Sequence, residues 1–314
     1  MKKAAHLIFS GILIAVLLSS LGGKFWLLDL FSHFYLIYWL VLAGVLNVFL
    51  YYKEKFFAYL CALVLVVVSL ELGAMVLNRA PMVKTPEARN QVRLLEYNSA
   101  GDLAGFQQWL PRHAGEFDVI VLLGAQPGAQ EFLEKVKSEY PFQNLHLQEG
   151  PFGLAVLSRW EIVATKEFQT EGGFYPQSEM QIKMPSGEEF LLYALHAPPP
   201  LAPTLAEAHE GILGELAEKI AGKRFPALVV GDLNTTARSH RFTKLVGLTH
   251  LRDTAGISPW ANTWPSALVN VASVLGIRID HCLVSNSFSL VERQRLEDLG
   301  SNHLPVKCVV QIEK

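Results

Sequence analysis

The first 77 residues of the chain contain three long runs that are almost free of charged side chains. Asp, Glu, Lys and Arg are absent from Ala4 to Gly23 and from Leu30 to Tyr52, and the third run, Phe56 to Leu77, contains only Glu71. An α-helix needs about 20 apolar residues to cross the hydrocarbon core of a bilayer, and each run reaches that length. We therefore predict that residues 1–77 form a membrane anchor of three transmembrane helices.

The lysines around these runs predict their orientation. Lys2 and Lys3 precede the first run, and Lys53 and Lys55 lie between the second and the third. Because basic flanks remain in the cytoplasm, the chain from about Arg79 onward should be extracytoplasmic, in a multi-pass protein of the cell membrane. An alternative is that MKKAAHLIFSGILIAVLLSS is a cleaved signal peptide. No small-x-small cleavage site follows it, and cleavage would leave the later domain on the same side.

The one charged residue inside the three runs, Glu71, allows two interpretations. It is either a functional membrane carboxylate or a residue near the outer end of its helix, where the side chain reaches the polar interface. We favour the second interpretation because the other two spans contain no charged partner for it.

The part of the chain that follows the membrane anchor is slightly acidic. Five of the 27 Lys and Arg and three of the 29 Asp and Glu precede residue 78, so the remainder has 22 basic and 26 acidic residues and a net charge of −4. Proteins that bind long nucleic acids neutralise phosphates with basic surfaces. The charge therefore argues against a nucleic-acid partner, and any phosphate chemistry should concern a small or lipid-linked phosphorylated molecule.

The pattern beyond the anchor predicts a linker at 78–91 and an α/β domain at 92–314. The linker is polar and contains two prolines. Strands are predicted at VRLLEYNS, VIVLLG, LAVLS, MQIKM, FLLYALH, ALVVGD, IDHCLVS and LPVKCVVQI. Helices are predicted at LAGFQQWL, QEFLEKVKSEY and LAEAHEGILGELAEKIAG. Such a mixture of consecutive strands and interleaved helices is typical of a sandwich of sheets covered by helices.

Several predicted strands end in polar side chains that a packed core does not need. The run ALVVGDLN presents two such side chains, two residues apart and therefore on one face if the strand persists. FLLYALH ends in a histidine just before three prolines that prevent further pairing. The full set is Asn98, His196, Asp232, Asn234, Asp280 and His303. A turn or a buried histidine explains any one of them alone, but all six together predict one cleft at the ends of two facing sheets.

Two cysteines of the α/β domain, Cys282 and Cys308, lie in apolar strand-like runs. An extracytoplasmic compartment permits a disulfide between them. Their apolar surroundings favour the other interpretation, in which both are small buried side chains.

The polar strand ends belong to an ordered set of short motifs that resembles the endonuclease/exonuclease/phosphatase superfamily over about residues 91–313. The motifs are YN at 97–98, DVIVLLG at 118–124, His196, GDLN at 231–234, TWP at 263–265, RIDH at 278–281 and SNHLPV at 301–306. The resemblance implies a deoxyribonuclease-like fold of two packed sheets and the hydrolysis of phosphate esters. Three membrane spans before this domain are similar to an arrangement in bacterial members.

The resemblance also implies a catalytic role for five of the residues. Asp232 would orient or deprotonate the attacking water. His303 would lie against the scissile phosphate, with its tautomer held by Asp280. Asn234 and His196 would donate hydrogen bonds to phosphoryl oxygens as negative charge develops.

The implied metal site departs from the family pattern. Asn98 would contribute an oxygen ligand to Mg²⁺ or Mn²⁺, but two carboxylates of the pattern, in D-V-I-x-L-x-E and S-D-H, are replaced here by Gly124 and Asn302. Glu96 lies two residues before Asn98, on the same face of a strand, and Gly124 would leave an empty volume into which it reaches. The metal ligands would then be Asn98, Glu96 and Asn302.

Two functions remain open at this point. The first is a membrane-anchored phosphoesterase that depends on Mg²⁺ or Mn²⁺ and acts on a small or lipid-linked phosphate ester outside the cytoplasm. The second is a degenerate, non-catalytic member that binds a phosphorylated ligand or partner. The retained Asp280 and both histidines favour the enzyme, whereas the lost carboxylates favour the binder because formal charge strongly controls divalent-cation affinity.

Overall fold

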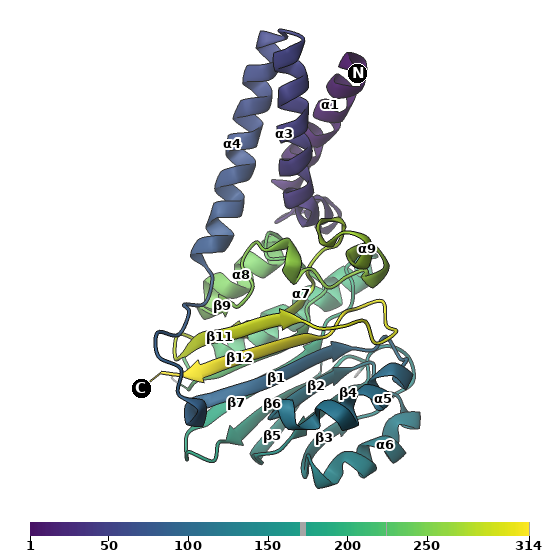
Figure 1. Ribbon diagram of the computed structural model, residues 1–314, viewed down its shortest axis with the longest axis vertical. Coiled ribbons are helices and arrows are strands. Elements are labelled where there is room, and N and C mark those ends of the chain that lie inside the picture. Colours follow the sequence, from purple (N-terminus) through teal and green to yellow (C-terminus); the bar gives the residue numbers. More distant parts are fainter. Residues whose placement is uncertain (170–173, 224, 314) are drawn as a thin grey trace.

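The computed structural model describes residues 1–169, 174–223 and 225–313. Helices from the N-terminus project from one side of an α/β domain (Figure 1). They are α1 (Lys2–Ser19), α2 (Trp26–Asp29), the 3₁₀ helix η1 (Leu30–Phe34), α3 (Tyr35–Tyr51) and α4 (Lys55–Leu77). Three segments are long and apolar enough to cross a membrane: Lys2–Ser19, Trp26–Tyr51 and Lys55–Leu77.

The three long helices pack on one another through a narrow apolar cluster. Phe9 of α1, Phe49 of α3 and Cys61 of α4 are almost fully buried in it. Large apolar side chains such as Leu7 and Leu70 point outward and are more than two-thirds exposed. A helix that is apolar all round is suited to a lipid environment, which agrees with the composition of these segments.

Two six-stranded mixed sheets form the α/β domain. The first has the order β11-β12-β1-β2-β4-β3, and the second has the order β5-β6-β7-β8-β10-β9. The strands of the first are β1 (Gln91–Asn98), β2 (Val119–Leu123), β3 (Phe142–His146), β4 (Leu154–Ser158), β11 (Phe288–Arg295) and β12 (Val306–Ile312). Those of the second are β5 (Glu161–Gln169), β6 (Pro176–Lys183), β7 (Glu189–His196), β8 (Ala227–Asp232), β9 (Arg252–Asp253) and β10 (Asp280–Val284).

Alternating side chains of these strands fill three apolar layers. The central layer lies between the sheets and contains Leu94, Val121, Leu192, Val230 and Cys308 among others. The opposite faces are covered by helices, α5 (Ala104–His113) and α6 (Gln130–Lys135) on the first sheet and α7 (Pro203–Ile220) and α8 (His240–Thr249) on the second. The domain is thus the two-sheet sandwich flanked by helices that the sequence predicts.

All eight predicted strands are present, and the three predicted helices correspond to α5, to α6 with the 3₁₀ turn after it, and to α7. The four strands that the sequence analysis missed are β3, β5, β9 and β11, which are the outermost strands of the two sheets. Cys282 and Cys308 are buried and unbridged, in agreement with the second interpretation above.

The predicted linker is attached to the domain for about half of its length. Ala80 N donates to Asp253 O at 2.8 Å, and Val83 N donates to Leu290 O at 2.8 Å. Leu290 N in turn donates to Pro81 O at 2.7 Å. The segment after α4 therefore follows the edges formed by β9 and β11, and β1 begins at Gln91, one residue earlier than predicted.

A buried carboxylate joins the membrane helices to the α/β domain. Asp29 is 2 % exposed and accepts hydrogen bonds from Ser239 Oγ at 2.7 Å and from His240 N at 2.9 Å. The guanidinium of Arg241 lies 3.5 Å from the same carboxylate. Because these groups form the first turn of α8, Asp29 caps that helix from another part of the chain.

Two further polar contacts extend this connection. Glu71 of α4 forms an ion pair with Arg238 at 3.0 Å, and the guanidinium of Arg238 lies 4.8 Å from the ring centroid of Tyr35. His33 Nδ1 and Thr236 Oγ1 are 2.9 Å apart. Glu71 therefore has a charged partner, but in the α/β domain and not in the other spans. The docking contact, which we define as Asp29, His33 and Glu71 with residues 236–241, orients the domain relative to the helices.

We expect Asp29→Ala to lower the free energy of unfolding by about 2–4 kcal/mol, because it leaves buried donors without an acceptor. Denaturant unfolding of the full chain in detergent measures the change, and amide hydrogen exchange should rise at residues 236–241. Asp102→Ala is the control, since Asp102 also caps a helix, accepting from Ala104 N, but is exposed. Equal effects of the two variants would contradict the role assigned to the docking contact.

Candidate active site

Hydrogen-bond register brings polar residues from both sheets to one end of the sandwich. Asp232, the last residue of β8, pairs with His196 at the end of β7 and with Asp280 at the start of β10. Asn98 is the last residue of β1 in the facing sheet. All four side chains are at most 4 % exposed. They share the face of their strands that points between the sheets, so this end of the core is polar.

The glycine before Asp232 is required by the spacing of the strands. Gly231 has φ of +145°, and a Cβ at this position would lie 2.0 Å from Leu195 O on the neighbouring strand β7. Only glycine allows so close an approach. The GD pair of the motif therefore keeps β7 and β8 in contact and places the Asp232 carboxylate beside His196.

Asn98 is the centre of the polar cluster. Its Nδ2 donates to Asp232 Oδ2 at 2.9 Å and lies 3.5 Å from Nε2 of both His196 and His303. Its Oδ1 accepts from Ala100 N at 3.0 Å. The amide of Asn98 thus links the first sheet to the carboxylate of Asp232 and to both histidines.

His303 and Asp280 form a dyad. His303 Nδ1 is 3.0 Å from both carboxylate oxygens of Asp280, which is hydrogen-bond distance. Thr263 Oγ1 donates to the same carboxylate. Ser301 Oγ donates to Asn98 O at 2.7 Å and accepts from His303 N at 3.1 Å. The bond to Asp280 leaves Nε2 of His303 directed at the cluster, 3.8 Å from Asp232.

Burial and mutual charge separate the pKa values of these groups. Burial raises the pKa of Asp232 to about 7, and the charge of Asp280 acts in the same direction. Burial alone would lower the pKa of His303, but Asp280 and then Asp232 outweigh it and raise the value to about 9. Against burial, His303 holds the pKa of Asp280 below its ordinary value. Burial lowers the pKa of His196 to about 3. At neutral pH the dyad is an ion pair and His196 is uncharged.

Asn234 lies at the edge of this cluster. It adopts a left-handed conformation with φ of +45°, its N–H donates to Asp232 Oδ1 at 2.7 Å, and its Nδ2 donates to Ala197 O at 2.9 Å. The side chain is half-buried. The structure therefore brings all six predicted strand-end residues together, with Asn234 as the most accessible of them.

The RIDH motif divides its residues between the site and the scaffold. Asp280 faces the cluster, whereas Arg278 forms a buried ion pair with Asp253 at 2.6 Å. His281 points to the other side of the strand, where its Nε2 lies 2.8 Å from Thr235 O. His281 thus fixes the loop that follows Asp232, and Arg278 fixes the segment at Asp253 and Gly256.

Glu96 lies deeper in the same end of the core than Asn98. It is 2 % exposed, and neither carboxylate oxygen has a hydrogen-bond partner among the described residues. Burial raises its pKa well above the ordinary value, and the charges of Asp280 and Asp232 add to this effect. Hard divalent cations prefer oxygen ligands. The unpartnered oxygens of Glu96 suit such a cation, and a second ligand group is formed by Asp232, Asp280 and His303, whose ligand atoms lie within 4.8 Å of one another.

The position of Glu96 corrects one detail of the sequence analysis. Glu96 pairs with Val121, whereas the residue of β1 nearest to Gly124 in register is Asn98, opposite Leu123. Gly124 leaves no empty volume, because a Cβ there would lie 2.7 Å from Gly101 N, and its φ is +75°. Glu96 therefore does not take the place of a side chain at Gly124. Asn302, the other substituted position, is exposed.

Several residues around the cluster were not found from the sequence. Thr263 and Ser301 form hydrogen bonds to the dyad. They lie in the TWP and SNH motifs, which are the sequence signal from which their role could have been predicted. Phe152 packs on His196 with ring centroids 4.8 Å apart. Tyr175 packs on Phe152 at 4.8 Å. This aromatic wall comes from loops whose sequence carries no comparable signal.

Comparison with known proteins agrees with this geometry. Residues 95–303 match the model of the endonuclease/exonuclease/phosphatase family. The chain belongs to this family. Its members are phosphoesterases and nucleases that generally depend on divalent metal ions.

Solved structures show the same fold at low sequence identity. An endonuclease/exonuclease/phosphatase from Beutenbergia cavernae DSM 12333 has a TM-score of 0.60 at 20 % identity, over 71 % of this chain and 72 % of that one. A humanized D. rerio TDP2 has a TM-score of 0.58 at 16 % identity, over 71 % of this chain and 99 % of that one. A family protein from Bacteroides vulgatus has a TM-score of 0.58 at 15 % identity, over 71 % and 99 %. No curated protein matches the chain.

We expect Asp280→Asn to lower the pKa of His303 well below about 9, because burial is then opposed by Asp232 alone. Titration of the imidazole by NMR in chelator-treated protein measures this value, with the resonance assigned from a His303→Gln spectrum. Glu131→Gln, at an exposed carboxylate, should leave the titration unchanged. A value that stays near 9 in Asp280→Asn would show that another group holds the charge of His303.

Proposed function

We propose that the chain is a membrane-anchored phosphoesterase that hydrolyses a small or lipid-linked phosphate ester outside the cytoplasm. The observation that supports this most strongly is the buried Asp280–His303 ion pair beside Asp232, since burying an ion pair costs desolvation energy that apolar side chains in its place would not. The net charge of −4 beyond the anchor supports a small or lipid-linked substrate over a nucleic acid.

In the proposed mechanism, Asp232 accepts a proton from the attacking water. A pKa of about 7 suits this role, because a general base works best when its pKa is close to the operating pH. His303, as the imidazolium held by Asp280, donates from Nε2 to a phosphoryl oxygen as its charge increases. Neutral His196 and the amide of Asn234 supply further hydrogen bonds to the same group.

A divalent cation such as Mg²⁺ or Mn²⁺ would be held by Glu96 and Asn98, with Asn302 at the rim. When bound, it supplies positive charge that polarises a phosphoryl oxygen. Because the pKa of Glu96 is raised, its buried carboxyl group is neutral without the ion and would have to lose its proton when the cation binds. Asn98 also orients Asp232 through its Nδ2 whether or not a cation is bound.

A second function, binding of a phosphorylated ligand without turnover, is favoured by the neutral residues at Gly124 and Asn302. These positions remove two formal charges from the family's metal site, and the backbone around Gly124 is closed by residues 99–101. The number of charged ligands controls affinity for divalent cations. A non-catalytic site of this kind would bind a phosphate group through its histidines but would not hold a cation.

Hydrolysis of a panel of phosphoesters separates the two functions. With Mg²⁺ or Mn²⁺ we expect turnover of phosphomonoesters or diesters, and a fall in kcat by about 10³-fold in Asp232→Ala because the water loses its base. Single-stranded DNA belongs in the panel because a D. rerio TDP2 structure contains such a product. Absence of turnover in the wild type, together with phosphate binding that His303→Ala abolishes, would favour the binding protein.

The orientation of the domain is a further part of the proposal. Lys2, Lys3, Lys53 and Lys55 lie at the ends of the helices away from the domain, where Lys2 pairs with Glu54. The positive-inside rule supports the proposal that residues 92–314 lie outside the cytoplasm.

A reporter enzyme that is active only outside the cytoplasm tests this orientation when fused after Lys314. We expect activity at that position and none when the same reporter replaces the chain after Tyr52. The reverse pattern would overturn the orientation and would move the substrate to the cytoplasmic side.

A further inference from the structure

A long uncharged segment in the α/β domain is not explained by the catalytic cluster. Between Asp253 and Arg278 the chain contains no Asp, Glu, Lys or Arg. The segment includes 3₁₀ helix η6 (Pro259–Ala261), α9 (Ser266–Val271) and 3₁₀ helix η7 (Ser273–Leu275). Surface loops of a water-exposed domain normally carry charges, so a stretch of this length with none requires an explanation.

The segment exposes large apolar side chains. Val271 is 78 % exposed, Trp260 is 73 %, Leu268 is 46 % and Leu275 is 45 %. We call this set the α9 face. A single exposed apolar residue is ordinary, but four within 16 residues, without a charge among them, form the kind of surface that contacts a partner or a membrane. The position of the α9 face in the molecule indicates whether it contacts a partner or a membrane.

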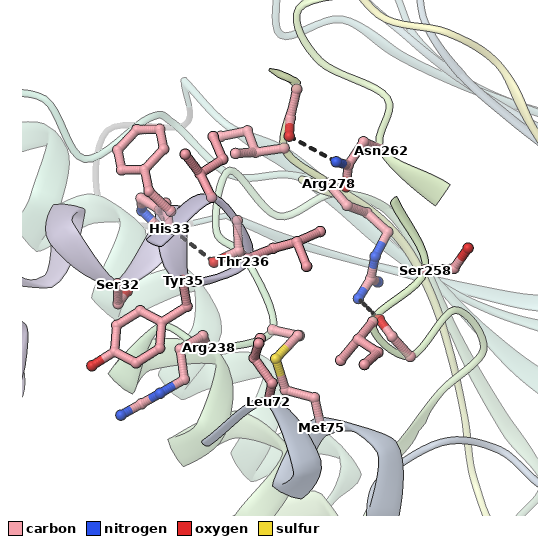
Figure 2. Close-up of a pocket in the computed structure, with 18 residues that line it drawn as sticks. Ser32, His33, Tyr35, Leu72, Met75, Thr236, Arg238, Ser258, Asn262 and Arg278 are labelled. Carbon is pink, nitrogen blue, oxygen red and sulfur yellow. Dashed lines mark hydrogen bonds between the residues drawn. The ribbon is translucent and has the colours of Figure 1, made fainter. Parts of the chain in front are cut away.

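The α9 face lies on the side of the domain that carries the membrane helices. In Figure 1, α9 is beside the domain-proximal ends of α1 and α3. A cavity of about 60 Å³ is lined jointly by Tyr35, Leu36 and Leu72 of the membrane helices and by Ile257 and Ile277 at the two ends of the uncharged segment. Figure 2 shows this boundary, with Ser258 and Arg278 across from Leu72 and Met75.

The docking contact fixes this arrangement. Buried Asp29 and the Glu71–Arg238 ion pair hold the domain on the ends of the spans. Phe25, in the short connection between the first two spans, and Leu27, at the start of the second, are also more than half exposed. Since the spans end at the surface of a bilayer, the apolar residues at the same level as these ends meet its interfacial region.

The α9 face is rigidly connected to the catalytic dyad. Ser266, the first residue of α9, donates from Oγ to Ser301 O and from N to Asn302 O, both at 2.8 Å. Thr263, three residues earlier, donates to the Asp280 carboxylate. Leu304 N donates to Thr263 O at 3.1 Å. The loop that carries His303 and the segment that carries the α9 face are therefore one hydrogen-bonded unit.

We propose that the α9 face inserts into the interfacial region of the membrane that the N-terminal helices span, and so presents the Asp280–His303 site to phosphate groups at the bilayer surface. Only the second part of this inference, the presentation of the site to phosphate groups, rests on the proposed phosphoesterase function. Tryptophan and aliphatic side chains on an uncharged surface are suited to this region. The substrate class that fits is a phosphate ester whose other part is a membrane lipid.

Insertion is tested without measuring hydrolysis. Val271→Cys, labelled with an environment-sensitive fluorophore, is reconstituted as the full chain in vesicles of phosphatidylethanolamine and phosphatidylglycerol. We expect a blue-shifted emission that nitroxide-labelled lipid quenches strongly. Val163→Cys is the matched control, because Val163 is 47 % exposed on β5, at the sheet edge farthest from β9 and the membrane helices. Equal quenching at the two positions would overturn the insertion.

The presentation of the site to lipid phosphates is tested with the same two head groups in two physical forms. Long-chain phosphatidic acid and phosphatidylglycerol in the vesicles are compared with their dissolved dibutanoyl forms. Val271→Asp and Leu268→Asp should lower hydrolysis of the vesicle lipids by about tenfold or more, because a charge opposes insertion, while Val163→Asp should not. Loss on both forms alike would overturn presentation to the membrane. Absence of all hydrolysis, with quenching at Val271 retained, would refute the phosphoesterase but not the insertion.

Discussion

The buried ion pair between Asp280 and His303 is the interaction on which the rest of the site depends. Three carboxyl groups, Glu96, Asp232 and Asp280, lie at the same end of a core that is otherwise apolar. One imidazolium compensates one of them, and the remaining two respond by raised pKa values. Burial of an unpaired charge is unfavourable by several kcal/mol or more, so the fold reaches neutrality by holding protons. The same balance leaves Asp232 able to exchange its proton near neutral pH.

The sequence predicted the central elements of this fold and missed its edges for a physical reason. Central strands such as β8 and β2 are buried on both faces and therefore appear as continuous apolar runs. The missed strands β3, β5 and β11 each pair with only one other strand of their sheet and carry exposed polar residues, as β5 does with Glu161, Lys166 and Glu167. Such a pattern is also typical of loops. The proposed catalytic residues were predictable because they lie at or next to the ends of inner strands, which the apolar runs define clearly.

Contacts between distant parts of the chain were not predictable in the same way. Glu71 lacked a partner in the sequence of the spans, and Arg238 reaches it only because the loop after β8 lies on the ends of the helices. Gly124 suggested a vacant site, yet the backbone of residues 99–101 fills the space. In both cases the deciding quantity is the path of a loop, which short-range patterns do not encode.

Asn302 and the uncharged segment from 254 to 277 lie next to each other at the rim of the site. Asn302 is exposed, and its backbone carbonyl binds the first residue of α9, so the neutral side chain lies where the site meets the proposed membrane surface. The uncharged segment from 254 to 277 continues from there. A carboxylate at this rim would repel an incoming phosphate group unless a cation neutralised it. The carboxyl groups of the site are instead Glu96, Asp232 and Asp280, which are at most 2 % exposed. A site with an uncharged rim, whose carboxyl groups are buried and either hold protons or pair with His303, therefore suits an anionic substrate that approaches along a bilayer.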